Sequence, residues 1–378
     1  MKRYIFIFLF CSLTFGCNHK NKKTESKDLD ILGGIDFISE QPDTLFKFEE
    51  LIAIRKADGY MLEISQLFET PYGYLILDKK NNFLGMFDKT GHFVRQYGSV
   101  GGGPDEYQGI QYVFIQGESV YVYSGWDSAL YKFNMATGTG MGKLRFPILA
   151  HQISPISENE LLVYVSNNPT DTHYNVYKTD YHGNILNVYF PFDPKKSNAV
   201  TTLTGFLHGR SESIYFSQPF DHQIYSYIPA EDQFKVQYAF DFVSSEMLKD
   251  RENFNFFVQT DFLYNPDRKG RLLRELFYKN NNYILLSIQF DTQVIYAVQN
   301  LKNQEISMFS KKVNSKFLKM LDKPVLLTEN DDLYFPLSPE KTAQGFEINE
   351  NEMLTLISNA IPEEDEGIVY YLLKVSIN

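Results

Sequence analysis

The sequence predicts an all-β fold, namely a six-bladed β-propeller of four-stranded antiparallel blades with a few short helical insertions. Two observations predict this class. Aromatic residues make up 16% of the 378 residues, and aromatic side chains favour strands over helices. In addition, a group of short strands joined by tight turns recurs about every fifty residues, which is typical of propeller blades.

The clearest copy of the repeat consists of residues 73–78, 83–91 and 93–97, three short strand-like segments joined by tight turns. In the turn before the third segment, Asp88 precedes Gly91, and the next two copies also place Asp or Asn shortly before Gly. The polar side chain closes an Asx turn, and the glycine accepts a positive φ. The turn chemistry therefore supports a meander of short strands.

Six copies follow one another along the chain. Their second strands start near Leu75, Val120, Leu161, Ile214, Tyr283 and Leu333. Residues 44–57 precede the first full copy and alternate between polar and apolar side chains, as strands do. We therefore predict that this segment supplies the missing strand of the last blade, which closes the ring and removes exposed sheet edges.

Two segments interrupt the strand pattern. Residues 244–257 and 347–359 mix polar and apolar side chains at helical spacing, so both are predicted to be helical insertions. A pair of β-sandwiches or a solenoid is the alternative to a ring. The meander turns and the lack of a shorter period favour the ring.

The start of the chain is typical of an export signal. Lys2 and Arg3 supply a positive start, and residues 4–10 form an apolar run that is too short to span a bilayer. Residues 13–17, LTFGC, resemble a lipobox, in which the cysteine sulfur takes a diacylglycerol. We predict cleavage before Cys17 and its lipidation; the alternatives are an ordinary signal peptide with an incidental cysteine, or an inefficient membrane anchor.

The chain is thus predicted to have three regions: a signal peptide at residues 1–16, a lipidated cysteine and flexible tether at 17–32, and the propeller at 33–378. The tether is polar and rich in lysine, without apolar periodicity. Both cysteines of the chain, Cys11 and Cys17, belong to the leader. No disulfide can therefore form within the propeller.

The charge balance excludes one class of partner. The formal net charge is −11 at pH 7, and loss of Lys2 and Arg3 with the signal leaves −11 − 2 = −13. Nucleic-acid binding depends on clustered lysine and arginine, so we expect no nucleic-acid partner.

A glycine-rich segment, YGSVGGGPDEY, occupies residues 97–107. We reject a phosphate-binding interpretation, because Pro104 lacks an amide donor and the carboxylates of Asp105 and Glu106 would repel an anion. We interpret the segment as a junction, in which glycines let the chain cross between blades and Pro104 sets the turn.

This segment resembles the Gly-Pro-x-Glu-Tyr junction of the six-bladed β-propeller lipoproteins of Bacteroidetes, relatives in architecture of NHL-repeat proteins. With the leader, the tether and the blades, the resemblance covers nearly the whole chain. It implies an outer-membrane lipoprotein of the cell envelope, held by an N-terminal lipid anchor with palmitate. The basic tether, where surface-exposed relatives carry acidic residues, favours a periplasm-facing position. The resemblance implies no activity.

In a four-stranded meander, the turns between the second and third strands lie on the same face as the connections to the next blade. This loop-rich face carries the longest insertions and the only tryptophan, and loops commonly carry function. We predict that it binds a glycan, peptide or protein. The candidate residues are Tyr107, Trp126 and Phe220, whose rings would stack on the ligand, and Asp127, Asp221 and His222, which would hydrogen-bond to it. The alternative, that Trp126 wedges between blades and the acids cap turns, stays open.

The sequence favours a binding or scaffold module over an enzyme, and it indicates no catalytic residue, metal ligand or cofactor. Propeller hydrolases with calcium need converging acids on the innermost strands, whereas Glu63, Glu69 and Glu275 share no register. No histidine spacing typical of zinc sites and no Gly-x-Ser-x-Gly elbow occurs. A Ser-His-Asp arrangement stays open, because its residues meet in space. The alternative function is a metal-dependent hydrolase or lyase with its site in the central channel.

Replacement of Cys17 by alanine is expected to abolish incorporation of labelled palmitate, because the acceptor sulfur is lost. Metabolic labelling followed by immunoprecipitation measures this. Cys11→Ala is the matched control and should keep the label, since Cys11 lies inside the leader. Equal labelling of Cys17→Ala and the unmodified protein would contradict the prediction.

Overall fold

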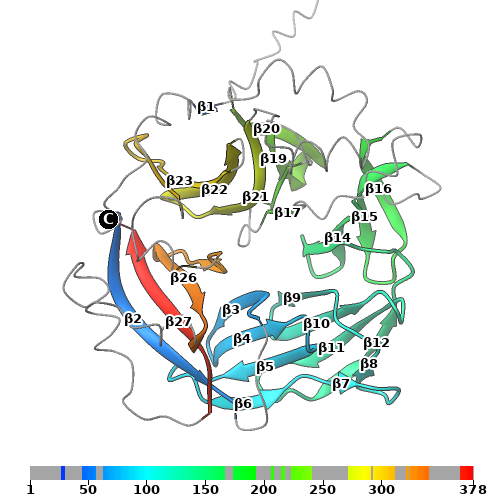
Figure 1. The fold of residues 1–378 in the computed structure, drawn as a ribbon. Coiled ribbons are helices and arrows are strands. Elements are labelled where there is room, and N and C mark those ends of the chain that lie inside the picture. Colours follow the sequence, from blue (N-terminus) through cyan, green and yellow to red (C-terminus); the bar gives the residue numbers. More distant parts are fainter. Residues whose placement is uncertain are drawn as a thin grey trace, which may run out of the picture.

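The computed structural model contains six blades, each built on four antiparallel strands and one of them extended by a fifth strand, arranged around a central axis (Figure 1). The structure describes residues 27–29, 45–56, 63–166, 173–192, 206–207, 214–217, 223–240, 271–290, 293–310, 321, 323–339 and 367–377. The prediction of an all-β, six-bladed propeller is confirmed. Within the described residues, no helix has the length and apolar character needed to cross a membrane.

The first three blades follow the chain in order, with the innermost strand first. The first blade contains β3 (Gln66–Thr70), β4 (Gly73–Asp78), β5 (Phe83–Phe87) and β6 (Phe93–Gln96). The second contains β9 (Tyr112–Gln116), β10 (Ser119–Ser124), β11 (Ala129–Asn134) and β12 (Gly140–Arg145). The third contains β13 (Gln152–Pro155), β14 (Glu160–Tyr164), β15 (Tyr174–Asp180) and β16 (Ile185–Pro191).

The next two blades repeat this order, and the sixth differs in the origin of its outermost strand. The fourth blade contains β17 (Phe206–Leu207), β18 (Ile214–Phe216), β19 (Gln223–Ile228) and β20 (Gln233–Phe240). The fifth contains β21 (Arg271–Lys279), β22 (Tyr283–Phe290), β23 (Gln293–Asn300) and β24 (Ile306–Ser310). The sixth contains β25 (Leu326–Leu327), β26 (Asp332–Leu337), β27 (Ile368–Ile377) and β2 (Phe46–Arg55).

The ring is closed by a strand from the start of the chain. Strand β2 pairs antiparallel with β27 from Phe46 opposite Ile377 to Arg55 opposite Ile368. The two strands lie side by side although they come from opposite ends of the sequence (Figure 1). The prediction that residues 44–57 complete the last blade is therefore confirmed.

The predicted tether contains a strand. Residues 27–29 form β1 (Lys27–Leu29), which pairs in parallel with β20 and adds a fifth strand to the fourth blade. Periodicity did not reveal it, because a strand of three residues is too short to show alternation. The predicted helical insertions at residues 244–257 and 347–359 lie outside the described residues.

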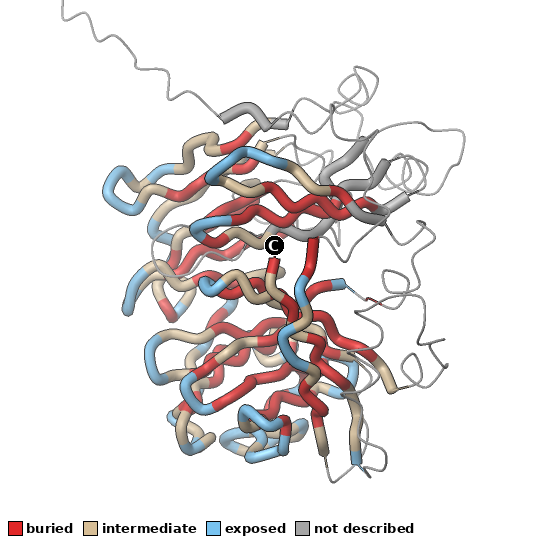
Figure 2. The backbone as a smooth tube through the Cα atoms, turned by 90° about the vertical axis from the view of Figure 1, so that its left-hand side faces the viewer, coloured by how far each residue is buried: buried red, intermediate tan, exposed pale blue. Residues whose placement is uncertain are grey.

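The core lies between adjacent blades. All six residues of β4 are buried, and Leu75 and Met86 of the first blade join Val113 and Val122 of the second in one apolar cluster. Burial follows the strands, and exposed residues gather at the turns (Figure 2). A strand with a blade on each side is buried on both of its faces, so it reads as a continuous apolar run rather than an alternating one.

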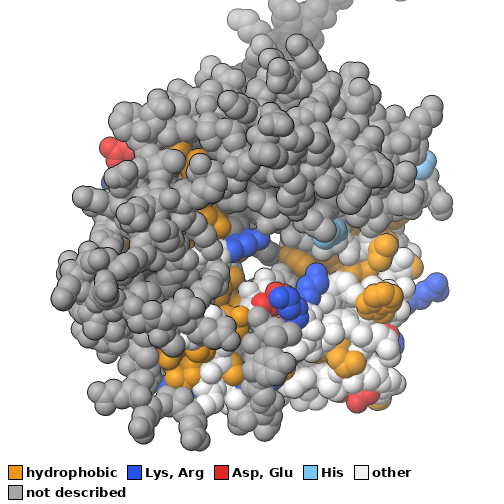
Figure 3. Space-filling model, in the orientation of Figure 1, with side chains coloured by type: hydrophobic (Ala, Val, Ile, Leu, Met, Phe, Trp, Pro, Cys, Tyr) orange, Lys and Arg blue, Asp and Glu red, His pale blue; other side chains and the backbone are white. Residues whose placement is uncertain are grey.

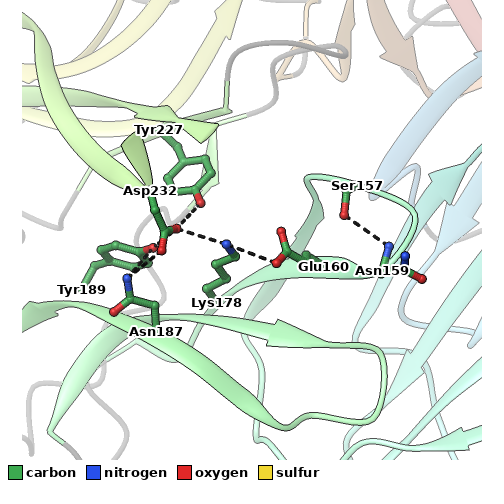
Figure 4. A network of polar contacts seen from close by, with 8 residues as sticks. All are labelled: Ser157, Asn159, Glu160, Lys178, Asn187, Tyr189, Tyr227 and Asp232. Carbon is green, nitrogen blue, oxygen red and sulfur yellow. Dashed lines mark hydrogen bonds and ion pairs between the residues drawn. The ribbon is translucent and has the colours of Figure 1, made fainter. Parts of the chain in front are cut away.

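A polar network centred on Asp232 joins the third and fourth blades (Figure 4). Asp232 follows the 3₁₀ turn η4 (Pro229–Glu231) and adopts a left-handed conformation. Its carboxylate accepts contacts from Tyr227 Oη (2.5 Å), Tyr189 Oη (2.6 Å), Asn187 Nδ2 (2.9 Å) and Lys178 Nζ (3.2 Å). Three of these donors belong to the third blade, so the carboxylate fastens one blade to the next.

The donors around Asp232 change its acidity. Burial by itself would raise the pKa of the Asp232 carboxyl, but the hydroxyls of Tyr189 and Tyr227 and the donors Asn187 and Lys178 outweigh burial. They hold the pKa well below its ordinary value. A carboxyl whose pKa is lowered on folding stabilises the native state above its unfolded pKa, and this stability is lost as the pH falls through the lowered pKa.

Asp232→Asn is expected to lower the free energy of unfolding at pH 7 by about 1–2 kcal/mol, the scale of charge-assisted hydrogen bonds discounted for solvent. The discount applies because the Asp232 side chain is 40% exposed. Urea denaturation measures the change. The difference between the two proteins should shrink as the pH falls below about 4, where the unfolded carboxyl of Asp232 takes up a proton.

Glu231→Gln is the control, because Glu231 is the neighbouring carboxylate and contacts only exposed partners, Gln233 and Lys235. It should leave the stability unchanged. Equal effects of the two substitutions at pH 7 would show that the network does not fasten the blades.

Candidate functional site

The glycine-rich segment forms a compact loop at the junction of the first and second blades. Strands β7 (Ser99–Val100) and β8 (Glu106–Tyr107) pair in parallel within it. The amide of Gly103 donates to Glu106 Oε2 at 2.7 Å, and the amide of Gly101 donates to the Tyr107 carbonyl at 3.1 Å. These amides are engaged within the loop, which agrees with the junction interpretation.

Tyr107 is the residue around which this junction packs. Its ring is fully buried and packs edge-to-face on Tyr131 with 5.9 Å between centroids. Its hydroxyl donates to the Tyr97 carbonyl at 3.1 Å, and burial raises its pKa. A ring held in this way has no face to offer a ligand. The prediction that Tyr107 stacks on a ligand is corrected: it stabilises the contact between the blades.

Trp126, in contrast to Tyr107, is exposed to solvent. It lies on the turn between β10 and β11, and it is 79% exposed. The idea that it wedges between blades is therefore wrong. Its ring lies beside Gly109, where an added Cβ would be 3.3 Å from the indole Cδ1. Trp126 is thus an aromatic surface next to the blade junction.

Asp127 holds this turn in place. Its carboxylate accepts hydrogen bonds from Ser124 Oγ at 2.6 Å and from the amide of Gln108 at 2.9 Å. Burial acts to raise the pKa of the Asp127 carboxyl, yet these donors lower it overall. The residue thus behaves as a turn cap, the second interpretation given above. Phe220, Asp221 and His222, the other candidates, lie outside the described residues.

The centre of the ring encloses a cavity of about 1180 Å³. The innermost strands β3, β9, β13, β21 and β25 contribute to its wall, as the predicted strand order requires. In Figure 3, charged side chains and a histidine gather around the middle of the face, with hydrophobic side chains beside them. The cavity is therefore a channel at the propeller axis, and its wall carries both polar and apolar side chains.

The Trp126 turn is connected to the mouth of this channel. The amide of Gly125 donates to the side-chain oxygen of Gln111 at 2.6 Å, and Gln111 lines the cavity. Leu149, which is 58% exposed, lies beside the same turn, since a Cβ on Gly125 would be 3.5 Å from its Cδ1. The Trp126 ring, Leu149 and the side-chain amide of Gln111 thus form one continuous surface.

His151 and Lys79 lie at the same mouth. His151 is half-buried, and burial lowers the pKa of its imidazole, with a further lowering from the neighbouring Lys79 ammonium. The imidazole is therefore neutral at neutral pH and can both donate and accept a hydrogen bond. We name the surface formed by Lys79, Gln111, Trp126, Leu149 and His151 the channel mouth.

Sequence reasoning identified Trp126 but missed its neighbours in the channel mouth. Gln111 and His151 stand just before β9 and β13, and Lys79 directly follows β4. Polar residues at the loop-rich ends of predicted innermost strands are the signal that could have found them. Among the described residues, no three histidine, aspartate or glutamate side chains come together in a way that could hold a metal ion.

These features define a six-bladed β-propeller with an exposed aromatic side chain beside a central channel whose wall is partly polar and partly apolar. A sequence profile of the family described as Domain of unknown function (DUF4934) matches residues 58–372. The chain therefore belongs to the DUF4934 family. The search of curated proteins found no match.

Solved structures from Bacteroides share the fold. One, which carries the name exported protein, comes from Bacteroides fragilis NCTC 9343 and aligns with a TM-score of 0.70 at 16% identity, over 89% of this chain and 97% of that chain. A member of the DUF4221 family from Bacteroides vulgatus ATCC 8482 aligns with a TM-score of 0.51 at 12% identity, over 89% of this chain and 99% of that chain. At such identities, the likeness shows the fold alone.

Gly98→Ala is expected to lower the free energy of unfolding by about 1–3 kcal/mol, the scale of backbone strain at a left-handed position. Gly98 has a φ of +65°, and an added Cβ would lie 2.6 Å from the Asp105 carbonyl oxygen. Urea denaturation measures the change. Gly102→Ala in the same loop is the matched control, because an added Cβ there meets nothing within 4 Å. Equal stability of the two variants would contradict the account of the junction.

Proposed function

We propose that this protein is an outer-membrane lipoprotein, lipidated at Cys17 and facing the periplasm, whose NHL-like propeller is a binding module. The channel mouth on its loop-rich face takes the ligand, a glycan, a peptide or a segment of a partner protein. The leader sequence, the lipobox-like residues 13–17 and a structural neighbour named as exported support the location.

The exposure of Trp126 is the observation that carries the binding role. Exposed apolar side chains are informative when they form a patch, and the exposed Leu149 lies beside the turn that carries Trp126. Here the turn is held by Asp127 and Gln111, so the ring is presented by a rigid support. Rigid presentation reduces the entropy lost on binding, which favours a role in recognition.

The surroundings of Trp126 suit a ligand with both apolar and polar parts. Leu149 extends the apolar surface, whereas Gln111, His151 and Lys79 offer hydrogen bonds and a positive charge at the channel. A concave site of mixed character with a few convergent polar groups is typical of ligand binding. The ligand therefore lies across the mouth, between the indole ring and the channel.

Trp126→Ala is expected to weaken ligand binding about tenfold or more, as loss of an aromatic anchor does. It should leave the stability nearly unchanged, because the side chain is 79% exposed. The full chain, purified in mild detergent, is screened by thermal shift against glycans and peptidoglycan fragments, and the ligands that raise the melting temperature are titrated by calorimetry.

Tyr72→Ala removes another exposed aromatic side chain, which lies on the turn between β3 and β4 at the other end of the channel, and serves as the control. It should keep full binding. Unchanged affinity in Trp126→Ala would remove the proposed site. A melting temperature raised by calcium or zinc and restored by chelator would instead support the metal-dependent hydrolase or lyase in the channel.

A further inference from the structure

The charges that line the central channel are separated by sign. At the loop-rich mouth the charged side chains of the wall are Lys79, Lys323 and Glu63. At the opposite mouth they are Glu69, Glu118, Glu329 and Lys279. Among the described residues, lysines therefore outnumber carboxylates at one end, and carboxylates outnumber lysines at the other.

The strand directions produce this separation. Each innermost strand runs from the loop-rich face to the opposite face, so the residue before it and the residue after it lie at different mouths. Glu69 near the end of β3 and Glu118 just after β9 therefore lie at the opposite mouth. Lys79 follows β4, which runs back, and therefore lies at the loop-rich mouth. A strand of five residues spans about 17 Å, so the two charge groups are well apart.

Glu63 is the one carboxylate of the loop-rich mouth among the described lining residues, and it is already engaged. Glu63 accepts a hydrogen bond from Ser65 Oγ at 2.6 Å and forms an ion pair with Lys80 at 3.3 Å. Its charge is therefore compensated by a lysine that does not line the cavity. Among the described residues, lysines therefore outnumber carboxylates in the wall of this mouth, on a chain whose formal net charge is −11. Such a local reversal of sign attracts an anionic group.

The wall of the channel also holds an acceptor that calls for a hydrogen-bond donor. The side-chain oxygen of Gln152, the first residue of β13 and the neighbour of His151, is buried and has no hydrogen-bond partner among the described residues. Gln152 lines the cavity. A carboxylate cannot satisfy this oxygen, because it carries no proton to donate, whereas a hydroxyl group can.

The third feature of the loop-rich mouth is the apolar ring of Trp126, which a short series of contacts connects to the turn of Lys79. Asn82 lies in the same turn as Lys79, and its side-chain oxygen accepts the Ile110 amide at 2.9 Å. Gly109, the residue before Ile110, lies against the indole. The cation and the aromatic face are thus on adjacent turns of the same mouth.

We propose that the channel mouth binds an acidic oligosaccharide, with a uronic-acid carboxylate beside Lys79 and a pyranose ring against Trp126. This inference rests on the proposed binding function and names its ligand class. A uronic acid combines an apolar ring face, hydroxyl donors for Gln152 and a carboxylate for the lysine. An acidic peptide would supply the charge and amide donors, but it has no pyranose ring to lie against Trp126.

The test compares an acidic oligosaccharide with its uncharged ester and with an acidic peptide. The full chain in mild detergent is titrated by calorimetry with tetragalacturonate, with its methyl ester and with tetraglutamate. We expect binding of tetragalacturonate that is at least tenfold tighter than binding of the uncharged ester, and that weakens as salt is added, because salt screens the charge.

Lys79→Gln should reduce the affinity for tetragalacturonate about tenfold, remove most of the salt dependence and leave the affinity for the ester unchanged. Lys89→Gln is the matched control, since it removes the same charge from the turn between β5 and β6 on the opposite face. It should bind as the unmodified protein does. Thermal unfolding of both variants verifies that they are folded.

The possible failures are distinguishable. Equal affinity for the acid and its ester, or equal behaviour of Lys79→Gln and Lys89→Gln, would overturn the acidic ligand while leaving a glycan-binding module in place. Tighter binding of tetraglutamate than of tetragalacturonate would also overturn it, in favour of an acidic peptide. If no glycan or peptide binds and Trp126→Ala matches the unmodified protein in every assay, the proposed function itself fails.

Discussion

The pairing of β2 with β27 is the constraint on which the rest of the structure depends. These strands join the two ends of the sequence along ten residues each, so the last blade forms only when the chain has gone round the whole ring. Without this closure, the sheets would keep open edges and the first and sixth blades would lose their shared apolar cluster. The central channel exists because the ring is closed, and its two mouths take their character from the strand ends that the ring brings together.

Packing between blades decides the role of each aromatic residue. Tyr107 and Trp126 belong to neighbouring loops, yet one is fully buried and the other is 79% exposed. Tyr107 follows the glycine-rich loop into the gap between two blades, where its hydroxyl reaches the Tyr97 carbonyl. Trp126 stands at the tip of a short turn that Asp127 and Gln111 tie to the junction. The same polar contacts that stabilise the loops therefore present the indole ring at the channel mouth.

Polar networks at the two faces of the ring have different consequences. Between the third and fourth blades, the Asp232 carboxylate gathers four donors and fastens two blades at the face opposite the loops. At the loop-rich end of the channel, Lys79, His151 and Gln152 line the cavity, and the Gln152 oxygen has no partner among the described residues. The Asp232 carboxylate has its hydrogen-bond donors within the protein, and this arrangement stabilises the fold. The arrangement in the channel is suited to a ligand that supplies a hydroxyl donor and a negative charge.

The sequence by itself determined the all-β class, the six blades, the closing strand and the order of strands from centre to rim, because turn chemistry and apolar runs are local properties of the chain. It also singled out Trp126 and Asp127 as neighbours on the loop-rich face. Only the tertiary structure decided that Tyr107 is buried, that Asp127 caps a turn, and that Lys79, Gln111 and His151 share one mouth. Burial and proximity depend on residues from other blades, and β1 depends on pairing with the distant β20, so no local pattern reveals them.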